Sequence, residues 1–293
     1  MVKVQEIFRK LKTRNDFLIK DKKGFSPITK ENSVNLNWWH IDYNDNSEQN
    51  LGDMLSEVVF DFLCQYYNID KNKTIKKTKH LFAIGSILYF GLQDTTVWGT
   101  GSLFPLQPTF SNKIKQRLIR KMDIRAVRGP KTRDSLMALG IRCPDVYGDP
   151  ALLLPLFYTP NLVGTKDKVL VIPHFEDNVD ITNFENVVIL NMKTKNWKQS
   201  IDLIASAKLV ISSSLHGIII AESYGVPALF LCTSGTKSIY KYEDYYYSTG
   251  RYELPIVNTI EDGLKYDITK IEKIDFSQIQ KKLIDVFPRD LWK

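Results

Sequence analysis

The stretch from Ser206 to Cys232 constrains the fold of this chain more than any other segment. It begins with a short apolar run rich in β-branched residues, Lys208 to Ile211, which is typical of a buried parallel strand. Polar residues follow, and then comes an apolar segment with helical spacing that ends at Gly225, a natural helix terminator. A second short strand is expected at Ala228 to Leu231. Strand, polar turn, helix and strand together predict half of a doubly wound α/β sheet.

The polar residues of this turn lie where such sheets bind ligands. Ser213, Ser214 and His216 are expected at the carboxyl end of the strand and at the amino terminus of the helix. Free backbone N–H groups at a helix amino terminus attract anions. His216 is therefore well placed to do chemistry beside a phosphate or a carboxylate, because an imidazole titrates near neutral pH.

Composition limits the class of protein without naming a partner. A chain of 293 residues suits two domains of ordinary size or one large domain, and 43% apolar residues exclude a disordered chain. The net charge of +7 favours anionic partners, and nucleic acid, anionic lipid and phosphorylated metabolites all meet this condition. Three widely spaced cysteines without a CxxC or metal-ligand spacing predict reduced thiols in a cytoplasmic protein.

The amino-terminal segment allows two interpretations. We expect neither a signal peptide nor a membrane span, so the protein should be soluble or at most peripheral. Val4 to Leu11 forms one apolar helical face with basic residues around it. This helix either packs on the first domain as an ordinary surface helix or lies on the anionic inner face of the cytoplasmic membrane.

We predict four strands in the first half of the chain, at Val34 to Tyr43, His80 to Leu88, Thr95 to Gly99 and Ile124 to Arg128. Gly85 and Trp98 mark two of these ends, where the backbone can approach a ligand closely. Asp53 is either a simple N-cap for a helix from Met54 or part of a site at a strand end. Arg128 is a candidate for contacting an anion, because it follows a strand directly.

The pattern of strands and helices restarts after a linker. We predict a strand and turn at Val146 to Leu154, a linker at Pro155 to Lys168, and then further βα units. A tyrosine-rich loop is expected at Ser238 to Tyr247. The fold class is thus α/β, with two Rossmann-like domains facing a cleft at residues 1–157 and 158–293. The last helix, Ser277 to Phe287, is compatible with packing back on the first domain.

Four histidines are available for catalysis. His40 and His80 are expected to be packed or capping groups, whereas His174 and His216 both follow strands of the second half and should point into the same cleft. The chain has no Walker loop, no HExxH motif and no G-x-S-x-G elbow. A transferase that uses neither a metal nor a resident cofactor fits this pattern best.

Several motifs, taken in order, resemble one family. They are NLGD at Asn50 to Asp53, IGSIL at Ile84 to Leu88, VWGTGS at Val97 to Ser102, VRGPKT at Val127 to Thr132, YGDPALLLP at Tyr147 to Pro155, IPH at Ile172 to His174, and SSSLHGIIIAESYGVP. From about Trp38 to Leu231 the chain resembles the polysaccharide pyruvyl transferases, and is most similar to the branch that modifies bacterial exopolysaccharides. This resemblance implies a GT-B-like fold of two domains. It also implies transfer of the enolpyruvyl skeleton of phosphoenolpyruvate onto two sugar hydroxyls as a cyclic ketal.

The resemblance suggests roles for the residues of the predicted cleft. His216 would protonate the methylene carbon of phosphoenolpyruvate, and His174 would position the donor or the acceptor hydroxyl. Ser213, Ser214 and Gly217, at the helix amino terminus, would hold the phosphate or carboxylate of the donor.

The acceptor and the cation that meets the donor are less clearly marked. Many family members carry arginine two residues before the histidine, where this chain has Ser214, so Arg128 or Lys237 would supply the positive charge instead. The acceptor sugar would lie near Asp53, Gly85 and Trp98, and the tyrosines of residues 242–247 would either stack on it or serve packing.

Two other functions compete with this one. A GT-B glycosyltransferase with a nucleotide-sugar donor is the alternative enzyme, since a histidine-glycine pair followed by a GVP strand is also common there. A nucleic-acid-binding protein would suit the positive charge, but the basic residues are scattered and form no recognition motif, so we expect no nucleic-acid partner. The expected partners are phosphoenolpyruvate and a glycan or lipid-linked oligosaccharide.

Overall fold

The computed structural model describes residues 34–41, 49–73, 80–89, 94–113, 120–162, 164, 167–174, 177, 184–233, 236 and 238–292. Two of the features expected from the sequence lie outside these residues, namely the basic helix at Val4 to Leu11 and Lys237 as a donor-binding residue. The first predicted strand is described as far as Ile41.

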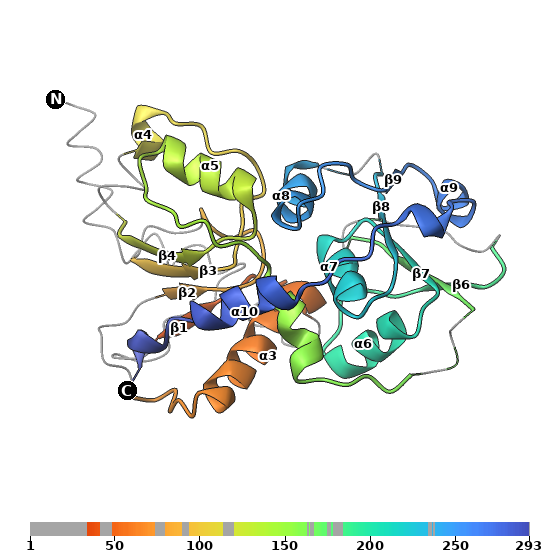
Figure 1. Cartoon of the computed structure of the whole chain (residues 1–293), viewed down its shortest axis with the longest axis horizontal. Helices are drawn as coiled ribbons and strands as arrows, with labels where there is room; N and C mark the ends of the chain where they lie inside the picture. Colours follow the sequence, from red (N-terminus) through yellow and green to blue (C-terminus); the bar gives the residue numbers. More distant parts are fainter. Residues whose placement is uncertain are drawn as a thin grey trace.

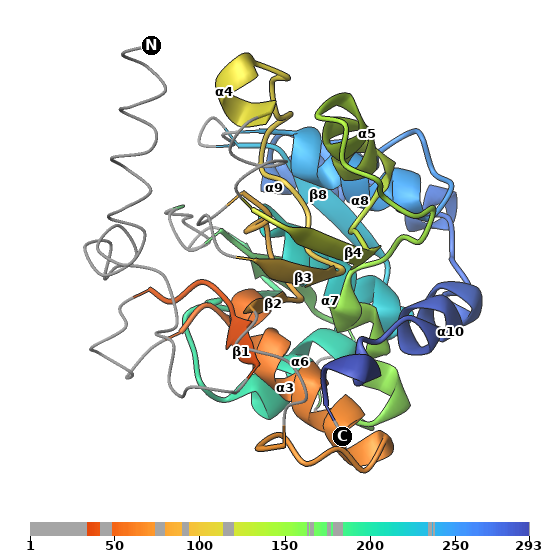
Figure 2. The same ribbon diagram turned by 90° about the vertical axis from the view of Figure 1, so that its left-hand side faces the viewer.

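The first half of the chain forms a parallel sheet. Its strands lie in the order β1 (Asn35–Asn37), β2 (His80–Phe82), β3 (Thr95–Trp98) and β4 (Met122–Ala126). In both views α3 (Leu51–Tyr66) lies on the β1 side, whereas α4 (Phe110–Lys113) and α5 (Pro130–Ala138) lie on the β4 side (Figure 1, Figure 2). The two central strands are buried along their whole length, as is usual in a parallel sheet.

The second half forms another parallel sheet, with the order β6 (Val187–Ile189), β5 (Val169–Ile172), β7 (Leu209–Ser212), β8 (Ala228–Leu231) and β9 (Ile256–Val257). Its helices are α6 (Trp197–Ala205), α7 (Leu215–Ser223), α8 (Tyr240–Ser248), α9 (Ile260–Leu264) and α10 (Ser277–Asp285). The short 3₁₀ helices are η2 (Pro150–Leu156), η3 (Ile268–Lys270) and η4 (Arg289–Leu291). Two parallel sheets with their helices confirm the predicted α/β class, whereas the division at residues 157 and 158 stays a prediction.

The segment from Ser206 to Cys232 forms the predicted strand, turn, helix and strand as β7, α7 and β8. Both strands are buried throughout, which explains their continuous apolar sequence. Gly225 follows the helix with a φ of +76°, a conformation that glycine adopts without strain.

The predicted start of the first helix is wrong. α3 begins at Leu51, and Asn50 is its N-cap, because the Oδ1 atom of Asn50 accepts the backbone N–H groups of Gly52 and Asp53 at 3.0 and 3.4 Å. Asp53 therefore lies within the first turn of the helix. Its carboxylate is not the N-cap of α3.

Two further predicted segments differ from the structure, one expected as a loop and one as a strand and turn. The tyrosine-rich segment is the helix α8, in which Tyr242, Tyr245 and Tyr246 are buried. Their spacing of three and four residues gives one aromatic helical face, and this explains why a helix forms here. Of the strand and turn expected at Val146 to Leu154, Tyr147 forms one parallel bridge with Val127. From Pro150 the chain is instead η2, which Asp149 caps by accepting the backbone N–H of Ala151 at 3.0 Å.

A continuous hydrophobic cluster joins the two sheets. It includes Leu55 of α3, Leu152 to Leu154 of η2 and Ile218 to Ile220 of α7. α10 lies beside α3 and the first sheet (Figure 1), where the indole Nε1 of Trp98 donates to the carbonyl oxygen of Leu283 at 2.9 Å. The connection between the sheets is thus part of the core.

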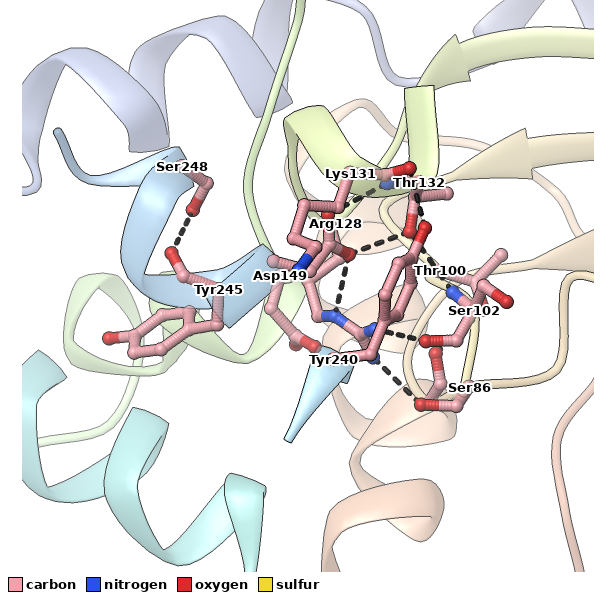
Figure 3. Close-up of polar contacts among 12 residues, drawn as sticks. Ser86, Thr100, Ser102, Arg128, Lys131, Thr132, Asp149, Tyr240, Tyr245 and Ser248 are labelled. Atoms are coloured by element: carbon pink, nitrogen blue, oxygen red, sulfur yellow. Dashed lines mark hydrogen bonds and ion pairs between the residues drawn. The ribbon is translucent and has the colours of Figure 1, made fainter. Parts of the chain in front are cut away.

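α8 joins the second half of the chain to the first. The fully buried carboxylate of Asp244 accepts Nε–H of Arg128 at 3.1 Å, together with the backbone N–H of Thr132 at 2.9 Å and its hydroxyl at 2.6 Å. Gly129 is the N-cap of α5 but has no side chain to cap it, so Asp244 caps α5 from α8. We call these contacts the Asp244–Arg128 junction; Figure 3 labels two of its residues, Arg128 and Thr132.

Replacement of Asp244 by alanine should strongly destabilise the protein. The Arg128 guanidinium would be left buried without its counter-charge, which costs about 3–5 kcal/mol in the free energy of unfolding. Urea denaturation measures this. The control is Asp285→Ala, which removes an exposed pair with Lys281 and should change the free energy by no more than about 0.5 kcal/mol. Equal effects of the two substitutions would contradict the junction's stabilising role.

Candidate active site

A cavity of about 330 Å³ lies where segments from both sheets converge. Most of its walls follow the carboxyl ends of strands: Trp39 after β1, Ser86 and Ile87 after β2, Leu103 after β3, His174 and Asp177 after β5, residues 213–216 after β7, and Thr236 and Ser238 after β8. Asn50 and Asp53 of the α3 start and Lys241 and Tyr242 of α8 complete the lining. Ligands of parallel α/β sheets bind at this edge.

His216 lies in the first turn of α7 and lines the cavity. Its Nε2 atom is 3.6 Å from Oδ2 of the fully buried Asp149. Neither atom has a hydrogen-bond partner among the described residues. A distance of 3.6 Å is that of an ion pair rather than of a hydrogen bond, and such contacts often shorten when a substrate binds. Asp149 can therefore orient the ring and hold its proton on Nε2.

The ring of His216 packs directly on the backbone of α3. A Cβ atom built on Gly52 would lie 2.0 Å from Nδ1 of His216, so only glycine leaves room for the ring at this position. The start of α3 is fixed there because the backbone N–H of Leu51 donates to the carbonyl oxygen of Met192 at 2.8 Å. A helix from the first half thus forms one wall for a histidine from the second.

Asp53 is the second titratable group on this wall. Burial raises the pKa of its carboxyl from the ordinary value of 3.8 to about 6, although the nearby positive charges of His216 and Lys241 act in the opposite direction. Gly85, with a φ of +104°, lies close to it, since a Cβ atom there would be 2.6 Å from Oδ1 of Asp53. The carboxyl group can therefore change its protonation state near neutral pH.

The serine turn between β7 and α7 is held by hydrogen bonds to residues that follow β5. Ser213 donates its hydroxyl to Oδ2 of Asp177 at 2.5 Å and accepts the backbone N–H of His174 at 2.9 Å. The Oγ atom of Ser212 would lie 2.4 Å from a Cβ atom on Gly217, which requires glycine there. His174, Ser213, Ser214 and His216 thus come together on one side of the cavity.

Other residues predicted from the sequence do not line the cavity. The Arg128 guanidinium is buried, and besides Asp244 it donates to the hydroxyl of Ser86 at 2.8 Å and to the carbonyl oxygen of Ser102 at 2.6 Å (Figure 3). Gly85 leaves room for the side chain of Asp53, and Gly217 leaves room for that of Ser212. Trp98 lies in the core. A role for Arg128 in donor binding stays a prediction, and its observed contacts are within the protein.

The two histidines that we expected to be packed are buried. His40 stacks on Trp38 with ring centroids 3.6 Å apart, and burial lowers its pKa to about 4. His80 contacts the side chain of Asn35 at 3.2 Å. Neither histidine lines the cavity.

Three charged residues of the site were missed by sequence reasoning. Asp149 is marked only by its position between glycine and proline, and Asp177 only by its place shortly after His174. Lys241 lies in a segment that we interpreted as a loop. The aromatic spacing of that segment could have shown a helix, but nothing local indicates that this helix reaches the cavity.

The comparison with known families agrees with the resemblance noted in the motifs. The family described as polysaccharide pyruvyl transferase matches residues 43–233. The chain belongs to this family. As a polysaccharide pyruvyl transferase family member, it carries Asp53, Asp149 and His216 within the matched region.

A curated relative is an uncharacterized protein of Acanthamoeba polyphaga mimivirus, which is 30% identical over 173 residues. The match covers 56% of this chain and 57% of the viral protein. The chain therefore spans little more than half the length of this relative.

Two further surveys cover the described residues. None of the described helices is both long and apolar enough to cross a membrane. Among the described side chains, no group of three or more His, Cys, Asp or Glu residues is arranged to hold a metal ion. The expectation of a reaction without metal or resident cofactor stays a prediction.

Alanine in place of Gly52 should destabilise the protein through the His216 ring. Within a helix this change normally stabilises by about 1 kcal/mol, but here the added methyl group meets the ring and should cost about 1–3 kcal/mol. In the His216→Gly background, which removes the ring and also the Cβ atom that would lie 2.7 Å away, the clash disappears, so the same change should become neutral or stabilising. Urea denaturation of the four proteins of this cycle measures the coupling. Additive effects would contradict the contact.

The raised pKa of Asp53 predicts how stability depends on pH. Between pH 4 and pH 6 the folded protein holds this proton more tightly than the unfolded chain, so the contribution of Asp53 to stability falls as the pH rises through this range. Asp53→Asn should therefore raise the free energy of unfolding at pH 7 by about 1–3 kcal/mol. The gain should vanish near pH 3.5. Glu57→Gln, an exposed change on the same helix, is the control.

Proposed function

We propose that the protein transfers the carbon skeleton of phosphoenolpyruvate onto two hydroxyls of a sugar, which forms a cyclic ketal and releases phosphate. The acceptor is a hexose of a surface polysaccharide or of its lipid-linked precursor. The observation that carries the proposal is His216, which lines the cavity with Asp149 at 3.6 Å and lies within the residues matched by the family.

The first step needs a proton donor. With Asp149 on Nε2, the ring of His216 is left to use Nδ1 toward the substrate. Protonated His216 gives the Nδ1 proton to the methylene carbon of phosphoenolpyruvate, and the electron pair of the double bond forms the new C–H bond. The neighbouring carbon becomes cationic, while Asp149 stabilises the positive charge of the ring before transfer.

The two sugar hydroxyls then complete the ketal. The oxygen of the first hydroxyl bonds to the cationic carbon, and its proton passes to the Asp53 carboxylate, whose pKa of about 6 suits a base near neutral pH. The bond from this carbon to the phosphate oxygen breaks, and the second hydroxyl takes its place. The second proton returns to His216, and Asp53 passes its own to the departing phosphate, so both groups regain their starting state.

The remaining side chains of the cavity bind rather than react. Donor binding involves Ser213, Ser214 and the backbone N–H groups at the start of α7, with His174 beside them. Acceptor binding involves Asp53 and the neighbouring segments of the first half. All steps draw on side chains of the protein, so the proposal includes no resident cofactor.

The setting of the reaction is also a proposal, and it rests on the sequence. We infer a GT-B-like pair of domains, a cytoplasmic location and, through the basic amino-terminal helix, peripheral contact with the inner face of the membrane. The net charge of +7 favours the anionic donor and an anionic surface.

Replacement of His216 by glutamine should reduce ketal formation by about 10²- to 10⁴-fold, because the general acid is lost. Asp149→Asn should cost a similar factor, since an amide cannot hold the ring proton in the same place. The assay incubates the protein with phosphoenolpyruvate and a panel of hexosides, and follows phosphate release and product mass. Asp145→Asn, an exposed change in the same segment, is the control.

Two results would contradict the proposal. Near-normal turnover by the His216→Gln variant would show that His216 is not the general acid. Transfer from a nucleotide sugar, without acceptor-dependent phosphate release from phosphoenolpyruvate, would establish the alternative glycosyltransferase.

A further inference from the structure

The charges that line the cavity are unbalanced for an anionic donor. Two carboxylates, those of Asp53 and Asp177, lie in its wall. Lys241 is the only lysine or arginine among the described lining residues. His216 loses its positive charge when it gives up its proton, so a donor with both a phosphate and a carboxylate needs a further, lasting cation to offset repulsion by these acids.

Arg128 does not meet this need from where it lies. Its Nε, Nη1 and Nη2 atoms donate to Asp244, Ser86 and Ser102. A Cβ atom on Gly101 would be 2.4 Å from the guanidinium carbon, so the backbone covers the group closely. Arg128 thus contacts the cavity only indirectly, by donating to the hydroxyl of the lining residue Ser86 (Figure 3).

Lys241, by contrast, extends from a helix that is held by contacts with both halves of the chain. The next residue, Tyr242, donates its hydroxyl to the carbonyl oxygen of Ser213 at 2.6 Å. Its ring stacks on that of Phe230, with ring centroids 3.8 Å apart. Two residues further, Asp244 forms the junction with Arg128. The backbone that carries Lys241 is therefore anchored to the serine turn of the second half and to α5 of the first.

The position of Lys241 within the cavity is also marked by its neighbours. Its Nζ atom lies 5.0 Å from the centre of the Tyr242 ring. Its positive charge acts on the Asp53 carboxyl, as does that of His216. Lys241 and His216 are thus close enough to act on the same group.

We propose that Lys241 binds an anionic oxygen group of the donor, its phosphate or its carboxylate, beside His216. This rests on the proposed function for the identity of the donor. Lys241 supplies from α8 a positive charge that the serine turn lacks, since Ser213 and Ser214 precede the histidine there. The Asp244–Arg128 junction positions the helix for this contact.

The test measures binding separately from turnover. Calorimetric titrations of phosphoenolpyruvate, inorganic phosphate and pyruvate are compared for the wild type, Lys241→Met and Lys241→Arg. Loss of one charge-assisted contact should weaken phosphoenolpyruvate binding by about 10- to 100-fold, and arginine should restore part of it. Lys281→Met, which removes an exposed lysine on α10, should leave binding unchanged.

The three ligands identify the group that is bound. Weaker binding of inorganic phosphate by Lys241→Met assigns the phosphate, and weaker binding of pyruvate assigns the carboxylate; either result supports the site. Unchanged binding of all three ligands would overturn it. A wild type that binds none of the three ligands would also overturn it. So would a Lys241→Met variant in which only the pKa of Asp53 changes, since the lysine would then serve only as a counter-charge to that carboxyl.

Failure of the proposed function gives a different result. If Lys241 is needed to bind inorganic phosphate but the wild type releases none from phosphoenolpyruvate with any acceptor, the anion site stands and the reaction is wrong. If turnover occurs and Lys241→Met leaves the KM for phosphoenolpyruvate unchanged, the reaction stands and this inference is wrong.

Discussion

The cavity depends on the contact between the first turn of α3 and the ring of His216. Asn50 caps this turn, and Leu51 ties it to the segment after β6, so the backbone at Gly52 is fixed where the ring must lie. The absence of a side chain at Gly52 lets the helix of one half and the histidine of the other come within van der Waals distance. Asp53, the residue after Gly52, and His216 are brought to the same cavity by this contact.

Three carboxylates, two of them fully buried, show how the surroundings of a charge decide its use. Asp244 accepts three hydrogen bonds and is therefore a structural group that joins two helices. Asp149 has one oxygen satisfied by the backbone and the other facing only His216. Asp53 lies against the cavity, and burial keeps its pKa near 6. A carboxylate that accepts few hydrogen bonds from the protein can instead bind a substrate group or exchange a proton.

The sequence predicted those parts of the fold and site that local patterns determine. β7, α7 and β8 were found because continuous apolar runs, bounded by serines, glycine and proline, are unambiguous, and with them came the position of His216. Asp149 and Lys241 were not found, since each reaches the cavity through packing between segments far apart in the chain. Arg128 was correctly placed at a strand end, but its partner Asp244 could not be seen, and a buried counter-ion changes the expected use of an arginine.

The connection between the two sheets has a consequence for how such a molecule can evolve. η2 packs against α3, α7 and α10, and its leucines belong to the shared core. The two halves are consequently not interchangeable modules, because a half taken from a relative would need a matching surface for η2 as well as for α8. Changes in sugar preference should therefore accumulate in the loops at the cavity mouth, while the joint between the halves changes slowly and as one unit.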